Sequence, residues 1–235
     1  MMASDAPASG AVAALGWPRV HFHRTDSTNE RARALATAGA PHGTLVTAHE
    51  QTAGRGRQGR AWTAPTGQAL LCSLVVRDPP RLLPLAAGAA VAAVAGEEAR
   101  IKWPNDVLVD ERKVAGILVE ARPQENWAVV GIGANIAVSL AELPAEVRER
   151  AGTLGLAPGE VEPWLGRLLA ALARWLKASE EDVLAFVRAR DALLHRPVRW
   201  ARGEGTGAGI DGDGRLVVLT ERGEVALESG EVHLD

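Results

Sequence analysis

Hydrophobic and polar positions repeat with two different periods along the chain, and each period predicts one kind of element. Alternating or branched apolar runs predict strands at residues 19–22, 44–48, 69–76, 101–109, 113–120 and 127–132. Apolar residues at helical spacing predict helices over residues 82–99, 160–177 and 179–194. The last three β-rich runs are joined by short turn-like segments, which is typical of antiparallel strands. We therefore expect an α+β domain with helices on a mixed, largely antiparallel sheet.

Two helix starts carry sequence signals of their own. Ser27 and Glu30 have the spacing of a capping box, which predicts a helix that continues to about Ala38. Ser179, followed by Asp182, predicts the start of the helix over 179–194.

The pattern changes after about residue 194. Short β-rich runs at 197–200, 216–219 and 224–227 are separated by glycine-rich turns. They predict a small β-barrel behind the main domain. We place an N-terminal tail at residues 1–18, the main domain at 19–194 and the C-terminal module at 195–235.

Composition narrows the class of protein. The net charge of -3 gives no general attraction to nucleic acid or to anionic membranes, so an anion site must come from local clustering. Cys72 is the only cysteine, which excludes an intrachain disulfide and suits a reducing compartment. The longest apolar stretch, 82–95, is shorter than the roughly 20 residues that cross a bilayer. We expect a cytoplasmic protein without a membrane span.

A glycine- and arginine-rich segment at residues 52–62 is the most unusual feature of the chain. Its glycines allow open backbone conformations and its arginines gather three fixed charges; these residues are Gly54, Arg55, Gly56, Arg57, Gly59 and Arg60. At ~8 Å and an effective dielectric of ~20, each arginine pair repels by about 2 kcal/mol. We expect a bound phosphate or carboxylate to order this loop. The alternative is a solvated basic loop.

Familiar motifs do not explain this segment. Its G-x-G-x-x-G match is followed by Pro65, Gly67 and a strand, whereas a dinucleotide-binding fold requires a helix there. Arg60 and Ala61 stand where a P-loop requires Lys and Ser or Thr. The chain also has no nucleophile-elbow or zinc-protease motif, so a hydrolase has no visible machinery.

Other polar residues are candidates whose spacing leaves two interpretations open. Lys102 ends an apolar run before a Pro-Asn-Asp turn, so it is either a cleft lysine or a surface lysine. The helix start at 27–29 is either a ligand site or a plain cap, and the same holds for Gln51. His21 and His23 share a strand face but have no evident third ligand, so we assign no metal site.

Taken in order, several short motifs resemble the motif series of the biotin protein ligases. They are Ser27-Thr28-Asn29, Gln51, residues 54–62, Lys102-Trp-Pro-Asn-Asp106, Lys113-Val-Ala-Gly-Ile-Leu118, Gly131-Ile-Gly-Ala-Asn135 and Arg196-Pro-Val198. The resemblance implies a catalytic domain similar to class II aminoacyl-tRNA synthetases, followed by an SH3-like barrel. About 18 residues precede the first strand, too few for a helix-turn-helix, so we expect the monofunctional type, without a DNA-binding domain.

The resemblance also implies an activity and a site. The expected enzyme, a biotin–(acetyl-CoA carboxylase) ligase, forms biotinyl-5'-AMP from biotin and ATP with Mg²⁺, then biotinylates a biotin carboxyl carrier protein. Expected biotin-binding residues are Ser27, Thr28, Asn29, Gln51, Arg55, Gly56, Arg57, Lys102 and Gly116. Expected ATP-binding residues are Arg57, Arg60, Trp62, Asn105 and Asn135, and expected catalytic residues are Lys102, Arg57 and Arg55.

The resemblance also implies partners, and two rival functions stay open. A homodimer is expected from the family, while neither nucleic acid nor a membrane is an expected partner. The nearest rival is a lipoate or octanoate ligase or transferase of related fold. A rival of another class is a nucleic-acid-binding module that uses the Gly-Arg loop, which the acidic balance disfavours.

Overall fold

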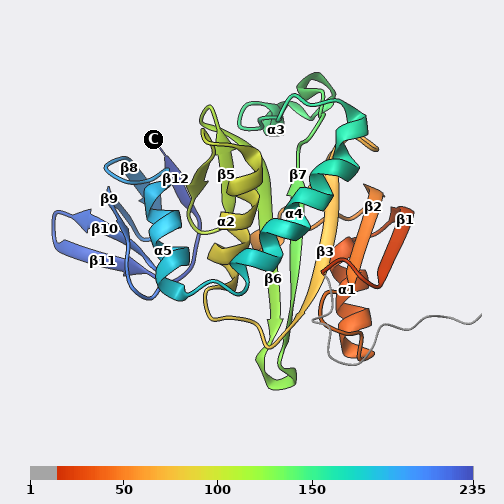
Figure 1. Ribbon diagram of the computed structural model, residues 1–235. Helices are drawn as coiled ribbons and strands as arrows, with labels where there is room; N and C mark the ends of the chain where they lie inside the picture. The colour runs from red at the N-terminus through yellow and green to blue at the C-terminus, as the bar shows by residue number, and fades with distance from the viewer. Residues whose placement is uncertain (1–14, 235) are drawn as a thin grey trace, which may run out of the picture.

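A seven-stranded sheet forms the centre of the protein, as the computed structural model of residues 15–234 shows (Figure 1). The strand order is β1-β2-β3-β7-β6-β5-β4. β1 and β2 are parallel, and the other neighbours are antiparallel. The predicted mixed, largely antiparallel sheet is therefore confirmed. The strands are β1 (Arg19–Thr25), β2 (Leu45–Gln51), β3 (Leu70–Arg77), β4 (Arg100–Lys102), β5 (Asp106–Val109), β6 (Arg112–Arg122) and β7 (Trp127–Ala134).

Helices cover both faces of this sheet. α2 and α4 cover one face, and α5 packs on α2 and on β9 of the C-terminal module; all three helices belong to the largest apolar cluster. α1 packs on the other face of the sheet in a smaller cluster. The α-helices are α1 (Thr28–Thr37), α2 (Leu83–Ala95), α3 (Ala145–Arg148), α4 (Val161–Trp175) and α5 (Glu180–Ala189). Single 3₁₀ turns are η1 (Arg57–Gly59), η2 (Pro123–Glu125), η3 (Leu140–Glu142) and η4 (Pro158–Glu160).

The predicted helices exist, but some of their ends differ. α2 stops before Gly96, whose φ of 118° lies in the region that favours glycine, so the predicted extension to residue 99 is wrong. α5 ends at Ala189, five residues earlier than expected. Ser179 caps α5 as predicted, because its hydroxyl accepts a hydrogen bond from the Asp182 amide at 3.1 Å. Ser27 makes no side-chain cap hydrogen bond, so the predicted capping box is wrong.

The C-terminal module is a five-stranded antiparallel sheet with the order β11-β10-β9-β8-β12. Its strands are β8 (Pro197–Trp200), β9 (Gly203–Ile210), β10 (Leu216–Thr220), β11 (Gly223–Leu227) and β12 (Val232–Leu234). The sequence pattern missed β9 because alternate glycines hide its period, and it missed β12 because that strand is short. The SH3-like barrel form and the proposed domain limits stay predictions.

Direct contacts join the module to the main domain. The indole of Trp103 donates to the Gly214 carbonyl at 3.0 Å, and the Arg188 guanidinium donates to the Ile210 carbonyl at 2.7 Å. Val198 and Leu216 belong to the same apolar cluster as α2 and α4. The module is therefore packed onto the main domain through a shared core.

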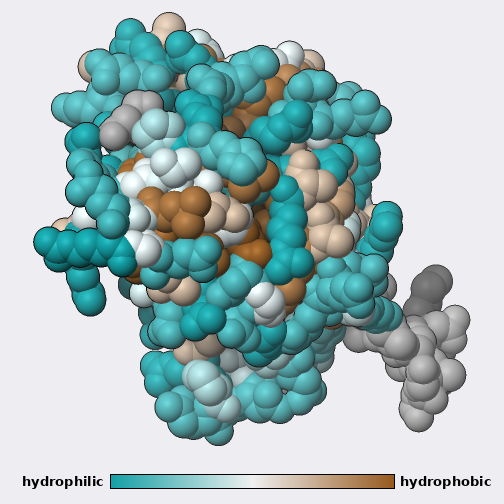
Figure 2. Space-filling view, turned by 90° about the vertical axis from the view of Figure 1, so that its left-hand side faces the viewer, coloured by the Kyte–Doolittle hydropathy of each residue, from teal (hydrophilic) through white to brown (hydrophobic). Residues whose placement is uncertain are grey.

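The surface and the helices add two observations. Figure 2 shows hydrophilic residues over most of one face, around a smaller central group of hydrophobic residues. Among the residues from 15 to 234, no helix is long and apolar enough to cross a bilayer. The predicted tail at 1–18 lies outside the described residues as far as residue 14.

Replacing Asp191 with Asn is expected to stabilise the protein at neutral pH. Burial raises the pKa of the Asp191 carboxyl, and its buried Oδ2 lacks a hydrogen-bond partner within the described chain. The folded protein therefore binds the carboxyl proton of Asp191 more tightly than the unfolded chain does. Ionisation of this carboxyl lowers the free energy of unfolding. The loss is complete above the folded-state pKa and disappears as the pH falls towards the ordinary pKa of Asp.

The measurement is thermal unfolding of both proteins between about pH 4 and about pH 8. The midpoint of Asp191→Asn should exceed that of the wild type by about 2–4 °C at the higher pH and by less in acid. The variant keeps a carbonyl for the Leu193 amide, which donates to Asp191 Oδ1 at 2.8 Å. A lower midpoint for the variant at about pH 8 would contradict this account.

Candidate active site

A cleft of about 300 Å³ opens on the sheet face that α1 covers in part. Its floor is formed by β6 and β7. Near α1, the cleft-facing positions of β7 are filled by Trp127 and Val129, which pack against the helix. Further along the strand the same face carries Gly131 and Gly133. No side chains cover β7 at these two glycines, so the cleft reaches down to the backbone of the strand there.

The glycines are required by close approaches of other side chains. A Cβ at Gly131 would lie 2.0 Å from Asn29 Oδ1, and one at Gly133 would lie 2.4 Å from Trp62 Cε2. On the next strand, a Cβ at Gly116 would lie 3.0 Å from Trp62 Cζ3. Larger residues would push Asn29 and Trp62 into the space that a ligand needs.

A polar socket closes one end of the cleft. The Gln51 carbonyl oxygen accepts from the Thr28 amide at 2.7 Å and from the Thr28 hydroxyl at 3.0 Å. The Ser73 hydroxyl donates to Asn29 Oδ1 at 2.6 Å, and its oxygen also lies 2.8 Å from Thr28 Oγ1. Asn29 in turn donates to Glu120 at 2.9 Å. This network fixes the start of α1 against the sheet and leaves the Ser27 hydroxyl in the cleft lining without a capping role.

The Gly-Arg loop folds over the cleft as a short hairpin. The Gly56 amide donates to the Arg60 carbonyl at 2.7 Å, and the Trp62 amide donates to the Gly54 carbonyl at 2.9 Å. A Cβ at Gly54 would lie 2.3 Å from the Trp62 carbonyl oxygen, so only glycine allows this pairing. The hairpin places the Trp62 indole over the glycine floor, with its buried N–H unpaired within the described chain.

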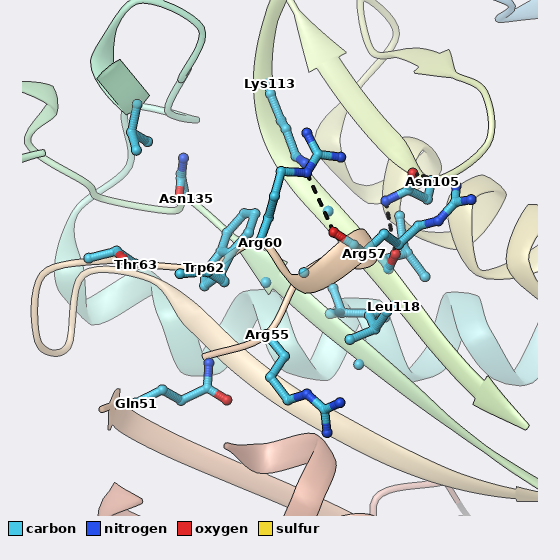
Figure 3. A pocket seen from close by; sticks show the side chains of 18 of the residues that line it. Gln51, Arg55, Arg57, Arg60, Trp62, Thr63, Asn105, Lys113, Leu118 and Asn135 are labelled. Atoms are coloured by element: carbon cyan, nitrogen blue, oxygen red, sulfur yellow. Dashed lines mark hydrogen bonds between the residues drawn. The ribbon is translucent and has the colours of Figure 1, made fainter. Parts of the chain in front are cut away.

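The three loop arginines have partners from distant parts of the chain. Arg55 pairs with Glu30 at 3.1 Å, Arg57 donates to Asn105 at 3.1 Å, and Arg60 pairs with Glu231 of the C-terminal module. Figure 3 shows the three arginines diverging from the loop rather than clustering. Two carboxylates thus offset the mutual repulsion expected from sequence alone. Ligand-dependent ordering of the loop stays a prediction.

Lys102 lies beside the main cleft rather than in its lining. It borders a smaller pocket together with Arg57, Asn105 and Glu231. Burial lowers the pKa of the Lys102 ammonium, and the nearby Asp106 carboxylate opposes that shift. Burial likewise lowers the pKa of Arg57. The small pocket adjoins the main cleft, because Arg57 and Asn105 line both.

All of the other predicted site residues gather in the main cleft. The cleft lining contains Ser27, Thr28, Asn29, Gln51, Arg55, Gly56, Arg57, Arg60, Trp62, Asn105, Gly116 and Asn135. Asn135 also has a structural task, since its amide donates to the Gly152 carbonyl at 2.8 Å. Asn105 similarly donates to the Ile117 carbonyl at 3.1 Å.

The structure adds residues that sequence reasoning did not select. Lys113 projects into the cleft (Figure 3) and pairs with Asp106 at 2.6 Å. The segment around α3 contributes Glu146, Val147 and Arg150 to the rim of the cleft. Lys113 belongs to the motif series, but the sequence pattern predicts only that it lies in a strand. The α3 segment has no comparable motif, so only its position beside the cleft reveals it.

A thiolate nucleophile finds no support at the cleft. Cys72 lines it, but complete burial raises the pKa of its thiol to about 12, so the thiolate is scarce at neutral pH. No group of three or more His, Cys, Asp and Glu in the part of the chain from 15 to 234 is arranged to hold a metal ion.

Comparison with known proteins connects this geometry to a family. Residues 21–136 match the model of the biotin/lipoate A/B protein ligase family. The biotin–(acetyl-CoA carboxylase) ligase of Paracoccus denitrificans is 36% identical, and the alignment covers 89% of this chain and 97% of that protein. The chain belongs to the biotin protein ligase family.

Other family members agree with this assignment. The bifunctional ligase/repressor BirA of Bacillus spizizenii is 33% identical, with 94% of this chain and 75% of that protein covered. The biotin protein ligase of Aquifex aeolicus, solved in complex with biotin and ATP, superposes with a TM-score of 0.79 at 30% identity, covering 92% of this chain and 98% of that chain. The expected fold class is therefore confirmed, whereas the roles of individual residues stay predictions.

Replacing Gly133 with Ala is expected to loosen the Gly-Arg loop. The added methyl would lie 2.4 Å from Trp62 Cε2, so the indole must move off the floor and the hairpin loses that contact. A loss of about 1 kcal/mol would raise the open population and trypsin cleavage after the loop arginines roughly five-fold. Gly159→Ala is the control, because no heavy atom lies within 4 Å of its added Cβ. Equal cleavage rates for Gly133→Ala and wild type would contradict the packing argument.

Proposed function

We propose that this chain is an ATP-dependent biotin protein ligase that activates biotin as biotinyl-5'-AMP and transfers it to a lysine of a biotin carboxyl carrier protein. One observation carries the proposal. A single cleft joins a neutral hydrogen-bonding socket to a cation-rich end across a glycine floor. Biotin has the matching order of groups, since a neutral ureido ring is joined by an apolar chain to a carboxylate.

The socket residues are assigned to the ureido ring. Ser27 and Thr28 offer hydroxyls, and Gln51 turns its carbonyl oxygen towards Thr28, which leaves its amide nitrogen for other contacts. Gly116 is assigned to the wall around the apolar part of the ligand, since its lack of a side chain lets Trp62 lie close to β6. Asn29 supports the socket through Ser73 and Glu120 rather than through a free amide.

The cationic end is assigned to the carboxylate and to the nucleotide. Arg55, Arg57 and Lys102 are the proposed catalytic residues, because their charges neutralise two anions that repel as they approach. Arg60 and Asn105 are assigned to the phosphates. Trp62 and Asn135 are assigned to the nucleoside, since both line the cleft on the side of Arg60 away from Arg57 (Figure 3). Arg57 and Asn105 line both pockets, which supports their assignment to the boundary between the two substrates.

The first step is in-line attack of the biotin carboxylate on the α-phosphorus of ATP. A new oxygen–phosphorus bond forms while the bond to pyrophosphate breaks, and pyrophosphate leaves as an anion. Neither partner needs a proton transferred, so positioning and charge neutralisation are sufficient. Mg²⁺ enters as part of the MgATP substrate, because Mg²⁺ commonly binds through substrate phosphates and water.

The second step uses the acceptor lysine of the carrier. Its neutral amine attacks the acyl carbon of the mixed anhydride, AMP leaves, and the amine gives up a proton. The folded Gly-Arg loop would shield the anhydride from water until the carrier arrives. A homodimer and a cytoplasmic location belong to the proposal as well, on the basis of the family and of the lone cysteine.

The decisive test is biotin-dependent exchange of pyrophosphate into ATP. The purified protein with MgATP should show exchange with biotin and at least ten-fold less with lipoate or octanoate, since those acids lack a ureido group for the socket. A ten-fold preference corresponds to about 1.4 kcal/mol of differential binding. Exchange with lipoate or octanoate alone would favour the related ligases, and absence of exchange with all three acids would overturn the proposal.

Replacing Arg57 with Ala is expected to release biotinyl-AMP from the enzyme. The variant loses the hydrogen bond to Asn105 at 3.1 Å and the charge that faces both pockets. Loss of one charge-assisted hydrogen bond should weaken retention about 10- to 100-fold. Rapid gel filtration after incubation with radiolabelled biotin and ATP measures the retained adenylate. Retention equal to that of the wild type would remove Arg57 from this role.

A further inference from the structure

Four charged side chains form a closed ring between α1, β6 and the Gly-Arg loop. The members of this charge ring are Glu30 and Arg33 of α1, Glu120 of β6 and Arg55 of the loop. Arg33 Nη1 lies 3.2 Å from Glu30 Oε2 and 3.4 Å from Glu120 Oε1. Arg55 Nη1 lies 3.1 Å from Glu30 Oε2 and 3.6 Å from Glu120 Oε1. Each charge therefore has two neighbours of the opposite sign.

The charge ring is a stronger connection than an isolated surface ion pair. Exposed pairs contribute little, because two flexible side chains must be ordered for one contact. In the ring each ordered side chain makes two contacts, and Arg33 and Glu120 are largely shielded, with 27% and 22% of their side chains exposed. Figure 3 shows the Arg55 side chain extending from the loop in the opposite direction from Arg60. The ring thus holds the first part of the loop against α1 and β6.

Glu120 also bonds to the polar socket. Its Oε2 accepts from the Asn29 amide at 2.9 Å, while its Oε1 faces Arg33 and Arg55. Asn29 Oδ1 in turn accepts from the Ser73 hydroxyl at 2.6 Å. The two oxygens of one carboxylate therefore join the socket to the Gly-Arg loop.

The strand holds this carboxylate on the cleft side of the sheet. Residues of a strand alternate between its faces, so Glu120 shares a face with Gly116 and Leu118, which line the cleft. Across the sheet, Glu120 pairs with Val129, which packs against α1. The side chain therefore stands where the helix meets the glycine floor, within reach of both the socket and the loop.

We propose that Glu120 is a positioning residue that couples biotin binding in the socket to closure of the Gly-Arg loop. This inference rests on the proposed function. A biotin ring in the socket restrains the Asn29 amide, and that amide restrains Glu120. The second oxygen of Glu120 then faces Arg55 in the geometry of the closed loop, so each event favours the other. Glu120 acts through these neighbours, since it lies outside the lining of the cleft.

Glu120→Gln separates the two bonds of this side chain. Glutamine has the same length and keeps a carbonyl oxygen for the Asn29 amide, but it has no charge for Arg55. Trypsin cleavage after Arg57 and Arg60 measures how often the loop opens. Saturating biotin should slow this cleavage at least about five-fold in the wild type and less than about two-fold in the variant.

Calorimetry gives an independent readout of the same coupling. Coupling between two events is reciprocal, so the variant should bind biotin about as many fold more weakly as it loses protection, which is about five-fold. A merely structural role would lower the unfolding temperature without linking protection to affinity. Wild-type protection together with wild-type affinity in Glu120→Gln would overturn the proposal.

Glu30→Gln is the matched control. It removes the other carboxylate partner of Arg55 and leaves the bond between Glu120 and Asn29 in place. Cleavage should rise by similar factors with and without biotin, so the protection ratio should stay near the wild-type value. An equal loss of protection in Glu30→Gln and Glu120→Gln would show that the ring only anchors the loop, and the coupling role of Glu120 would be wrong.

Arg55→Gln tests the connection from the loop side. If Glu120 acts through Arg55, the double variant E120Q/R55Q should lose no more protection than R55Q alone. A further loss in the double variant would contradict a connection through Arg55. The single variant R55Q also serves if Glu120→Gln does not fold, since unchanged protection in R55Q would equally refute the coupling.

The wild type separates failure of the inference from failure of the proposed function. Absence of biotin binding by the wild type would overturn the proposed function itself. Biotin binding without protection of the loop would instead overturn only the coupling through Glu120.

Discussion

The site depends on the absence of side chains at two alternate positions of β7. Gly131 and Gly133 leave the sheet face open, so Asn29 can lie against the strand and Trp62 can cover the floor. The apolar residues of α1 pack against Trp127 and Val129, whereas the polar first turn of the helix meets the strand at the glycines, where Asn29 approaches Gly131. Side chains at the glycine positions would fill the cleft and displace both the socket and the loop.

Charge balance is the second requirement of this arrangement. The cations of the cleft are held by carboxylates from separate elements: Glu30 of α1 for Arg55, Asp106 of β5 for Lys113, and Glu231 before β12 for Arg60. These carboxylates partly neutralise the mutual repulsion of the cations, and an incoming anion can replace them. Through Glu231 the C-terminal module takes part in this balance, which connects it to the Gly-Arg loop.

Most of the fold could be predicted from the sequence, because the spacing of apolar residues indicates which side of a helix or strand is buried. Alternating or branched apolar runs predicted most strands of the main sheet, and the Ser179 cap predicted the start of α5. The run predicted at 101–109 was wrong as a single strand, because the turn at residues 103–105 divides it into the antiparallel strands β4 and β5. Predictions failed where the local sequence pattern carries no information about the folded structure. The alternate glycines of β9 carry no apolar period, and Ser27 matches a capping box although its neighbours Thr28 and Asn29 are held by Gln51 and Ser73 instead.

By itself, the sequence determined the order of the elements, the Gly-Arg loop and the motif series that points to the family. Tertiary structure alone decided which charges meet: it set Lys102 beside the main cleft, turned Lys113 into it, and brought Glu231 to Arg60. The physical reason is that side-chain direction depends on strand register. One extra residue at a bulge moves a lysine from one face of a sheet to the other, and ion pairs between distant segments exist only after the chain has folded.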